Sequence, residues 1–294
     1  KVTEEAIAYS KATGMSVAQG RQAVMESYNL AASQKNLLGT AKEILQVQSD
    51  FVKHYGRLNM ISGETATQIV NMGKSFGYGA TVATQVQETL METGGASEQV
   101  ALNMQAASVA MIESMGVAPG KVMKDLAENG RELANAMAGN AEEMVKTAAY
   151  AASIGLDIKS MLAMTDKLLN INDSLTDQMT YQAISGKQIN LEKARYLKAI
   201  GKEKEAAEEM TKQLELQGDL TKMSTAARDE LAKLYGVEIS DLMRMNKLNQ
   251  ISKNLSAEQA ELVKKYGDSL GDISDMSADQ IVKAASMAQM TERL

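Results

Sequence analysis

The tetrad Ser153-Ile154-Gly155-Leu156 closes a run of apolar residues and is the clearest guide to the fold. The same order of serine, apolar residue, glycine and apolar residue occurs at Ser75-Phe76-Gly77-Tyr78 and at Ser114-Met115-Gly116-Val117. Successive glycines of the three tetrads are 39 residues apart (77, 116 and 155). Glycine readily adopts the left-handed conformation just past a helix end, and the apolar residue that follows folds back onto the last turn. Each tetrad therefore predicts a helix end, with its glycine at positive φ.

Two further breaks divide the 39-residue intervals. The run Gly94-Gly95-Ala96-Ser97 predicts a turn inside the first interval, and Asn129-Gly130 predicts one inside the second. Each interval then holds two helices, and repeats of 20 to 50 residues in helical sequences are typical of stacked hairpins. The repeat fades after Leu156. We therefore expect stacked antiparallel helical hairpins, arranged as an elongated bundle or an irregular solenoid.

The composition favours an all-α fold. The 294 residues include one proline, 4% aromatic residues and 21 methionines. Proline disrupts helix interiors, so its scarcity permits long helices, and the abundant Ala, Leu, Met, Glu, Lys and Gln are strong helix formers. Methionine also adapts its shape to irregular gaps, which suits either an ordinary core or a surface that packs against other copies.

A longer amphipathic stripe is expected after the third tetrad. Its inward positions, spaced by three or four residues, are Ile158, Met161, Leu162, Thr165, Leu168, Leu169, Asn172, Leu175 and Met179. Thr165 and Asn172 interrupt it seven residues apart. Polar residues at such spacing can fix the register of a coiled coil, or the stripe can turn away from the core there.

The second half is more charged and carries shorter signals. A helix is expected from Gln188 to Ile200, followed by a tight turn at Gly201-Lys202 and a helix that places Ala206, Met210 and Leu214 on one face. Two runs, Ser256-Ala257-Glu258-Gln259 and Ser277-Ala278-Asp279-Gln280, match the capping box that starts a helix. A domain boundary is expected near Gly218, which gives a repetitive hairpin region at 1–217 and short capped helices at 218–294.

No reactive site is expected. His54 is the only histidine and there is no cysteine, so the usual nitrogen and sulfur ligands of zinc are lacking, and we expect His54 to be structural or exposed. None of the four Gly-Lys pairs has the earlier glycine that a phosphate-binding loop requires. We predict no catalytic, cofactor-binding or metal site, no cofactor and no enzymatic activity.

Charge and hydropathy limit the partners. The net charge is −6 and the sequence contains no cluster of basic residues, so we expect no sequence-specific binding of nucleic acid. No stretch reaches the roughly 18 apolar residues of a membrane span, so none is expected in this segment.

One segment resembles the tail tape measure proteins of tailed bacteriophages. The run from Ser185-Gly186-Lys187-Gln188-Ile189-Asn190-Leu191 through Glu192-Lys193-Ala194-Arg195, followed by Lys198-Ala199-Ile200-Gly201, is similar to a stretch in that family. In the family a Gly-basic-Gln-apolar-Asn-Leu run leads into an Ala-Arg helix and a glycine turn. The resemblance extends over about Ser114–Gln250 and includes the runs at 151–169 and 232–242.

The resemblance implies a helical virion structural protein inside the tail tube, which sets tail length and is released ahead of the DNA. Its expected partners are other copies of itself, tail tube and baseplate hub proteins, and assembly chaperones. The expected location is the virion, with the host cytoplasm during assembly. The chain is shorter than most of the family and lacks their hydrophobic spanning segment, so we expect it to be a fragment. The alternative is a helical-repeat module that binds other proteins.

Self-association is also expected from the residues themselves. The stretch from Thr65 to Ile112 is Ala- and Met-rich and has only Lys74, Glu88, Glu92 and Glu98 as charged residues. A single hairpin of this composition has few polar groups to cover its outer faces. We expect its apolar surface to pack against a second copy, or against the charged second half of the chain.

Overall fold

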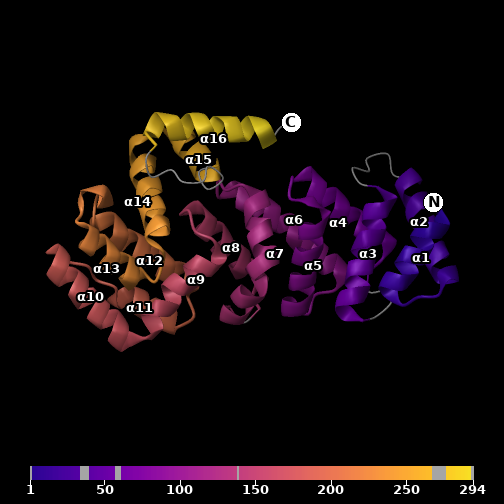
Figure 1. Ribbon diagram of the computed structural model, residues 1–294, viewed down its shortest axis with the longest axis horizontal. Coiled ribbons are helices and arrows are strands. Elements are labelled where there is room, and N and C mark those ends of the chain that lie inside the picture. Colours follow the sequence, from indigo (N-terminus) through magenta and orange to yellow (C-terminus); the bar gives the residue numbers. More distant parts are fainter. Residues whose placement is uncertain (1, 34–39, 57–60, 138, 267–275, 293–294) are drawn as a thin grey trace. The chain divides into compact units, whose positions relative to one another are not determined.

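The computed structural model describes residues 2–33, 40–56, 61–137, 139–266 and 276–292. In these residues every regular element is a helix, so the predicted all-α fold is confirmed. The chain divides into two compact units: residues 1–110 with 119–131, and residues 111–118 with 132–294. The boundary expected near Gly218 is not a boundary of these units, since side chains on both sides of Gly218 share one core. Figure 1 labels the helices.

The first unit is a series of helical hairpins. Its helices are α1 (Val2–Thr13), α2 (Val17–Ser33), α3 (Ala41–Tyr55), α4 (Gly63–Ser75), α5 (Gly79–Gly94), most of α6 (Glu98–Ser114) and the first part of α7 (Pro119–Ala136). From α1 to α5, each helix packs against the next, and α3 also contacts α1 and α5. The turn predicted at 94–97 separates α5 from α6, with Gly95 at φ 58°.

The break expected at Asn129-Gly130 was wrong. Helix α7 continues through Gly130 to Ala136, where Met137 caps it, and Gly139 has φ 76°. Gly130 serves packing rather than a turn: a Cβ built on it would lie 2.9 Å from Cγ2 of Thr89. The missing side chain lets α7 approach α5 closely.

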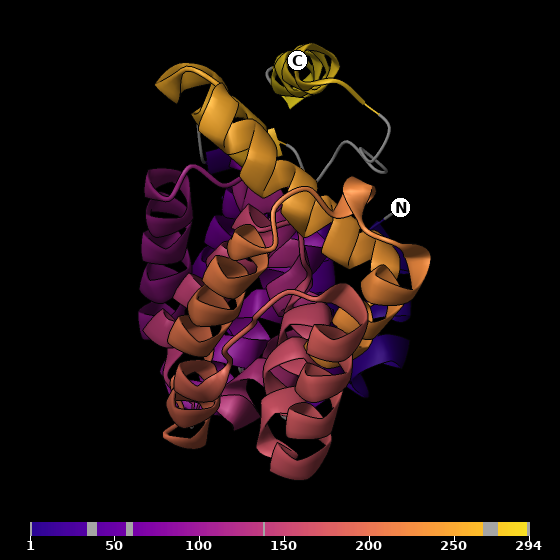
Figure 2. The same cartoon turned by 90° about the vertical axis from the view of Figure 1, so that its left-hand side faces the viewer.

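The second unit contains the more charged half of the chain. Its helices are α8 (Ala141–Ser153), α9 (Ile158–Asp166), η1 (Lys167–Leu169), α10 (Ile171–Ser185), α11 (Glu192–Ala199), α12 (Glu203–Leu216), η2 (Leu220–Lys222), α13 (Thr225–Tyr235), α14 (Ile239–Asn254), α15 (Ala257–Tyr266) and α16 (Ala278–Glu292). Buried side chains from α8 to α14 form one core, which includes Tyr181 and Tyr235. Figure 2, in which this unit faces the viewer, shows α14 lying obliquely across the other helices. A smaller core joins α14, α15 and α16.

Local signals for helix ends were largely correct. Gly77, Gly116 and Gly155 have φ of 75°, 70° and 83°, as predicted. At the third tetrad, the Leu156 N–H donates to Ala151 O and the Gly155 N–H to Ala152 O, the reciprocal pair of a glycine-ended helix. Both expected capping boxes form. In each, the serine Oγ accepts the N–H of the glutamine and the glutamine Oε1 accepts the N–H of the serine.

The long stripe expected from Ile158 to Met179 is broken. Its members are buried as far as Leu168, which lies in η1, and the non-helical Asn170 then changes the direction of the chain. Helix α10 buries Ser174, Asp177 and Tyr181, so Leu175 and Met179 point to solvent. The stripe therefore turns away from the core and forms no continuous coiled-coil seam.

Candidate functional site

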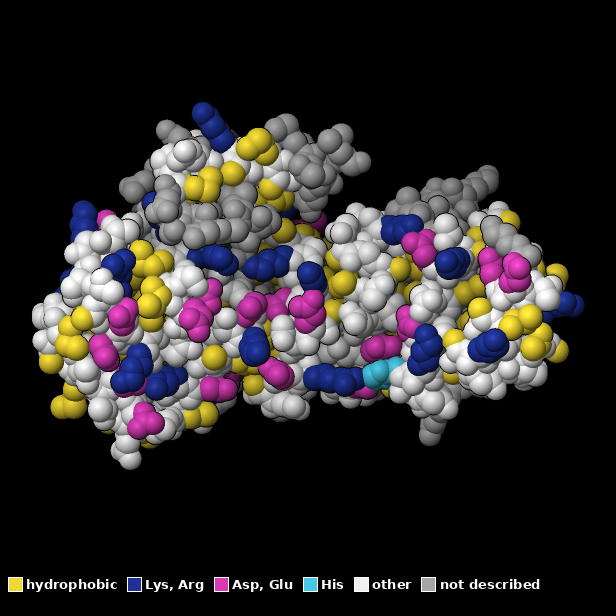
Figure 3. Space-filling view, viewed as in Figure 1, with side chains coloured by type: hydrophobic (Ala, Val, Ile, Leu, Met, Phe, Trp, Pro, Cys, Tyr) yellow, Lys and Arg dark blue, Asp and Glu magenta, His cyan; other side chains and the backbone are white. Residues whose placement is uncertain are grey.

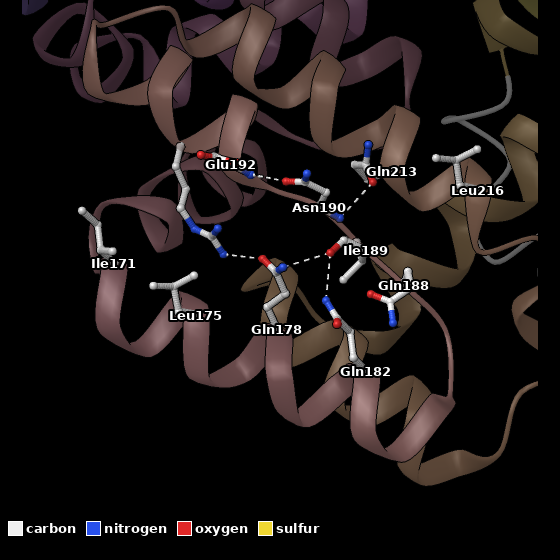
Figure 4. Close-up of a pocket in the computed structure, with 11 residues that line it drawn as sticks. Ile171, Leu175, Gln178, Gln182, Gln188, Ile189, Asn190, Glu192, Gln213 and Leu216 are labelled. Carbon is white, nitrogen blue, oxygen red and sulfur yellow. Dashed lines mark hydrogen bonds between the residues drawn. The ribbon is translucent and has the colours of Figure 1, made fainter.

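An open groove in the second unit is the best-formed candidate site. It has a volume of about 810 Å³ and lies between α10, the non-helical segment 186–191, α11 and α12. We call it the amide groove because amide side chains contribute most of its polar groups: Gln178, Gln182, Gln188, Asn190 and Gln213. Figure 4 shows these side chains with Ile171, Leu175 and Leu216 around the same depression.

Hydrogen bonds from amide side chains hold the non-helical segment 186–191 in place. Gln178 and Gln182, one turn apart on α10, each donate from Nε2 to Ile189 O at 2.9 Å. The Asn190 N–H donates to Gln213 Oε1 of α12 at 3.1 Å (Figure 4). Two side chains of the segment, Ile189 and Leu191, are buried. A helix was expected from Gln188, but α11 begins at Glu192, and these contacts hold the residues before it in a non-helical conformation.

The start of α11 is capped from within the same run. Asn190 Oδ1 accepts the Glu192 N–H at 2.9 Å, so a side chain satisfies one of the free amides at the start of the helix. At the other end of the run, Gly186 has φ 68° and ends α10. The groove wall is therefore specified by a glycine, an asparagine and two glutamines that lie close together in the sequence.

Arg195 is the cation of the groove and is already engaged. Its Nε donates to Ser174 Oγ at 3.0 Å and an Nη donates to Gln178 Oε1 at 2.7 Å. Burial lowers the pKa of the Arg195 guanidinium, while the nearby Glu192 carboxylate acts in the opposite direction. An arginine stays protonated near neutral pH. The groove thus carries one positive and one negative charge, which suits an uncharged ligand.

The apolar part of the groove is open to solvent. Ile171, Leu175 and Leu216 are 58%, 42% and 75% exposed. Amide groups can both donate and accept hydrogen bonds, and aliphatic groups gain free energy when water is excluded from them. This combination is typical of a surface that contacts another polypeptide.

His54 lies in the first unit, whereas the residues that line the amide groove belong to the second unit. Its Nε2 contacts Oε1 of Glu92, its Nδ1 lies 3.8 Å from Oε2 of Glu88, and Arg131 Nε is 3.1 Å from Oε2 of Glu92. Burial raises the pKa of Glu88; His54 opposes the rise, and Asp50 and Glu92 add to it. The contacts of His54 with Glu88 and Glu92 link α3 to α5, and the ion pair of Arg131 with Glu92 links α7 to α5. Among the described residues, no group of three or more histidine, aspartate or glutamate side chains is placed to hold a metal ion.

Sequence reasoning did not single out the amide groove. Leu175 was expected to point inward, and no site was expected anywhere. The sequence feature that could have indicated the groove is a set of five glutamine and asparagine residues between 178 and 213. They lie in and around a short run without helical periodicity.

Within the described part of the chain, no helix combines the length and apolar character needed to cross a membrane. No protein-family profile, curated protein sequence or solved structure matches this chain.

Proposed function

We propose that this chain is a structural segment of a bacteriophage tail tape measure protein. In this proposal it lies inside the tail tube, contributes to tail length and leaves the tube before the DNA. Copies of the chain associate with one another, and the segment contacts tube and baseplate hub proteins and assembly chaperones. It has no catalytic role and does not read nucleic-acid sequence.

The amide groove carries the proposal. The run Ser185–Arg195, on which the resemblance to the family rests, forms one wall of this groove. The groove offers hydrogen-bonding amides and exposed aliphatic side chains. That chemistry supports a role in contacts between proteins.

A length test separates a tape measure from other structural proteins. In the phage that encodes the chain, the α5–α6 hairpin would be deleted in frame from Gly79 to Ser114, or duplicated. Loss of these residues should shorten the tail by up to roughly 50 Å, at about 1.5 Å per helical residue, and duplication should lengthen it by as much. Electron micrographs of negatively stained tails give the lengths.

The control keeps the residue count unchanged. Asn103→Ala in the same hairpin alters an exposed side chain only, so tails should keep their normal length. Peptide mass spectrometry of purified virions shows whether the chain is present. Absence from virions, or tails of unchanged length with the deleted and duplicated chains, would overturn the proposal.

A helical-repeat binding module is the second candidate, and the same groove favours it. Such a module would hold a peptide along the amide wall and need not be part of a virion. Binding of a partner through the groove, together with absence of the chain from purified tails, is the result that distinguishes it.

A further inference from the structure

Exposed apolar side chains gather in one part of the second unit. Of the fifteen large hydrophobic side chains exposed among the described residues, eight lie between Leu169 and Leu216. Figure 3 shows hydrophobic side chains at the surface over α10 and α11. The stretch from Thr65 to Ile112, where such a surface was expected, exposes only Val100 among its large hydrophobic residues. Its other large apolar side chains are buried or partly buried.

Four exposed residues form a row along the outer side of α10. Ile171, Leu175, Met179 and Ala183 follow one another at intervals of four, and we call them the α10 row. Met179 is 71% exposed, more than Ile171 or Leu175. Rows at this spacing are the ridges that pack into the grooves of a second helix.

The opposite side of α10 is firmly anchored. Asp177 forms ion pairs with Lys167 and Lys233, each at 2.9 Å, and Tyr181 donates a hydrogen bond to Gln217 at 2.8 Å. A helix held in this way presents the α10 row on a rigid support. Little ordering entropy would then be lost when a partner binds.

Charge is almost absent from the exposed side of α10. Asp173 is the only charged residue of the helix that is exposed, since Asp177 is buried in its ion pairs. The whole chain carries a net charge of −6, so two copies repel each other weakly at long range. The α10 row offers two copies a contact where like charges do not face each other.

We propose that a second copy of this chain docks on the α10 row, with the two α10 helices antiparallel about a two-fold axis. With the axis between Leu175 and Met179, Leu175 of one copy lies opposite Met179 of the other, and Ile171 lies opposite Ala183. The arrangement places the bulky side chain of Ile171 against Ala183, which has the smallest side chain of the row. It satisfies the rule that a two-fold interface be self-complementary, and it sets the two helix dipoles in opposition.

The inference rests on the self-association that is part of the proposed function, and it names the surface involved. It does not depend on the location in a phage tail. Sedimentation equilibrium of the purified full chain provides the first test, with Met179→Glu compared with Met25→Glu. Met25, on α2 of the first unit, is 54% exposed and serves as the matched control.

The wild-type chain and Met25→Glu should show the same concentration-dependent dimer. Met179→Glu should raise the dimer dissociation constant about tenfold or more, because a carboxylate would lose its hydration against apolar side chains. Circular dichroism checks that each variant is folded. A wild-type chain that stays monomeric overturns self-association, whereas equal dimerisation of both variants overturns only the α10 surface.

Cysteine cross-linking tests the proposed register. The sequence contains no cysteine, so an introduced thiol has no competitor within the chain. Leu175→Cys and Met179→Cys chains, carrying tags of different size, would be mixed and oxidised mildly. The mixed disulfide dimer should exceed either homodimer severalfold, because residue 175 faces residue 179. A mixture that gives no more cross-linking than Met25→Cys would overturn the arrangement.

Discussion

The two units bury polar side chains in different ways. In the first unit, Ser10, Thr67, Thr84 and Ser108 are buried, and each donates its hydroxyl hydrogen to the backbone oxygen four residues earlier in its own helix. Such bonds satisfy the hydroxyl without help from another element. In the second unit, several buried polar groups connect different elements, among them Asp177, Lys198, Glu203, Gln217 and Asn246.

The network around Lys198 illustrates the second pattern. Lys198 on α11 contacts Glu203 on α12 and lies 2.7 Å from Asp166 on α9, while Thr165 Oγ1 donates to the other oxygen of Glu203 at 2.9 Å. Lys198 and Glu203 are 7% and 3% exposed. Since each group depends on a partner from elsewhere, the network fixes how three helices meet. The first unit has only partial counterparts, such as Gln105, which donates to Ala83 O across the α5–α6 hairpin.

The largest loss of stability is expected for a substitution of Glu203. Glu203→Ala leaves the buried Lys198 ammonium with Asp166 alone and should lower the free energy of unfolding by about 3 kcal/mol. Glu205→Ala is the matched control, since Glu205 lies in the same first turn of α12 but is 42% exposed. The control should change stability by no more than ~0.5 kcal/mol. Urea denaturation followed by circular dichroism measures both, and similar losses would remove the contrast between buried and exposed pairs.

Asn246 should give the next largest effect. Its Oδ1 accepts the Leu220 N–H at 3.2 Å and its Nδ2 donates to Gly218 O at 2.7 Å, so one side chain satisfies two backbone groups of the loop around η2. Asn246→Leu should lower the free energy of unfolding by about 2 kcal/mol, because both groups lose their partner. Amide hydrogen exchange should rise in residues 218–222. Asn103→Leu, an exposed change in the first unit, should leave exchange there unaltered.

Asp177 predicts a pH dependence of the second unit. Burial opposes ionisation of this carboxyl, but the hydrogen bonds and charges of Lys167 and Lys233 outweigh it and lower the pKa of Asp177 below its usual 3.8. The folded state therefore binds the proton more weakly than the unfolded state. Its stabilisation is present above pH 3.8 and is lost as the pH falls through the lower pKa of the folded state.

Asp177→Asn should remove this contribution. At pH 7 the substitution should lower the free energy of unfolding by about 1.5 kcal/mol, through loss of hydrogen bonds to a charged acceptor. The gap between wild type and variant should close as the pH drops below 3.8. Asp173→Asn, exposed on the same helix, controls for the general change in charge. A gap that stays constant from pH 7 to pH 2 would contradict the assignment.

Local features of the fold were predictable from the sequence, because a helix end is determined by a few adjacent residues. Gly116, Gly155 and the two capping boxes needed no information from distant parts of the chain. The turn at Gly201 was also correct, and Ala206, Met210 and Leu214 are buried on one face of α12 as expected.

The errors arose where a distant contact decides the outcome. Gly130 lies inside α7 and close to Thr89, a contact that the sequence around Gly130 does not reveal. Residues 186–191 form no helix, and amides from α10 and α12 bond to Ile189 and Asn190 within them. The amide groove was missed for the same reason, since its walls come from three helices and a connecting segment.

The smallest predicted effect makes the most direct comparison, because the same substitution is made in both units. Thr67 and Thr165 are both fully buried in helices. The Thr67 hydroxyl donates to Gly63 O of its own helix, whereas the shortest contact of the Thr165 hydroxyl is with Glu203 Oε2 on another helix. Thr67→Val should change the free energy of unfolding by at most ~0.5 kcal/mol, since the carbonyl keeps its helical bond. Thr165→Val should lower it by about 1 kcal/mol, because a buried carboxylate loses a donor. Valine matches threonine closely in shape and helix propensity, so the hydroxyl is the main difference. Urea denaturation of the two variants should therefore place Thr165→Val lower, and the opposite order would show that bonds between elements do not set the stability of the second unit.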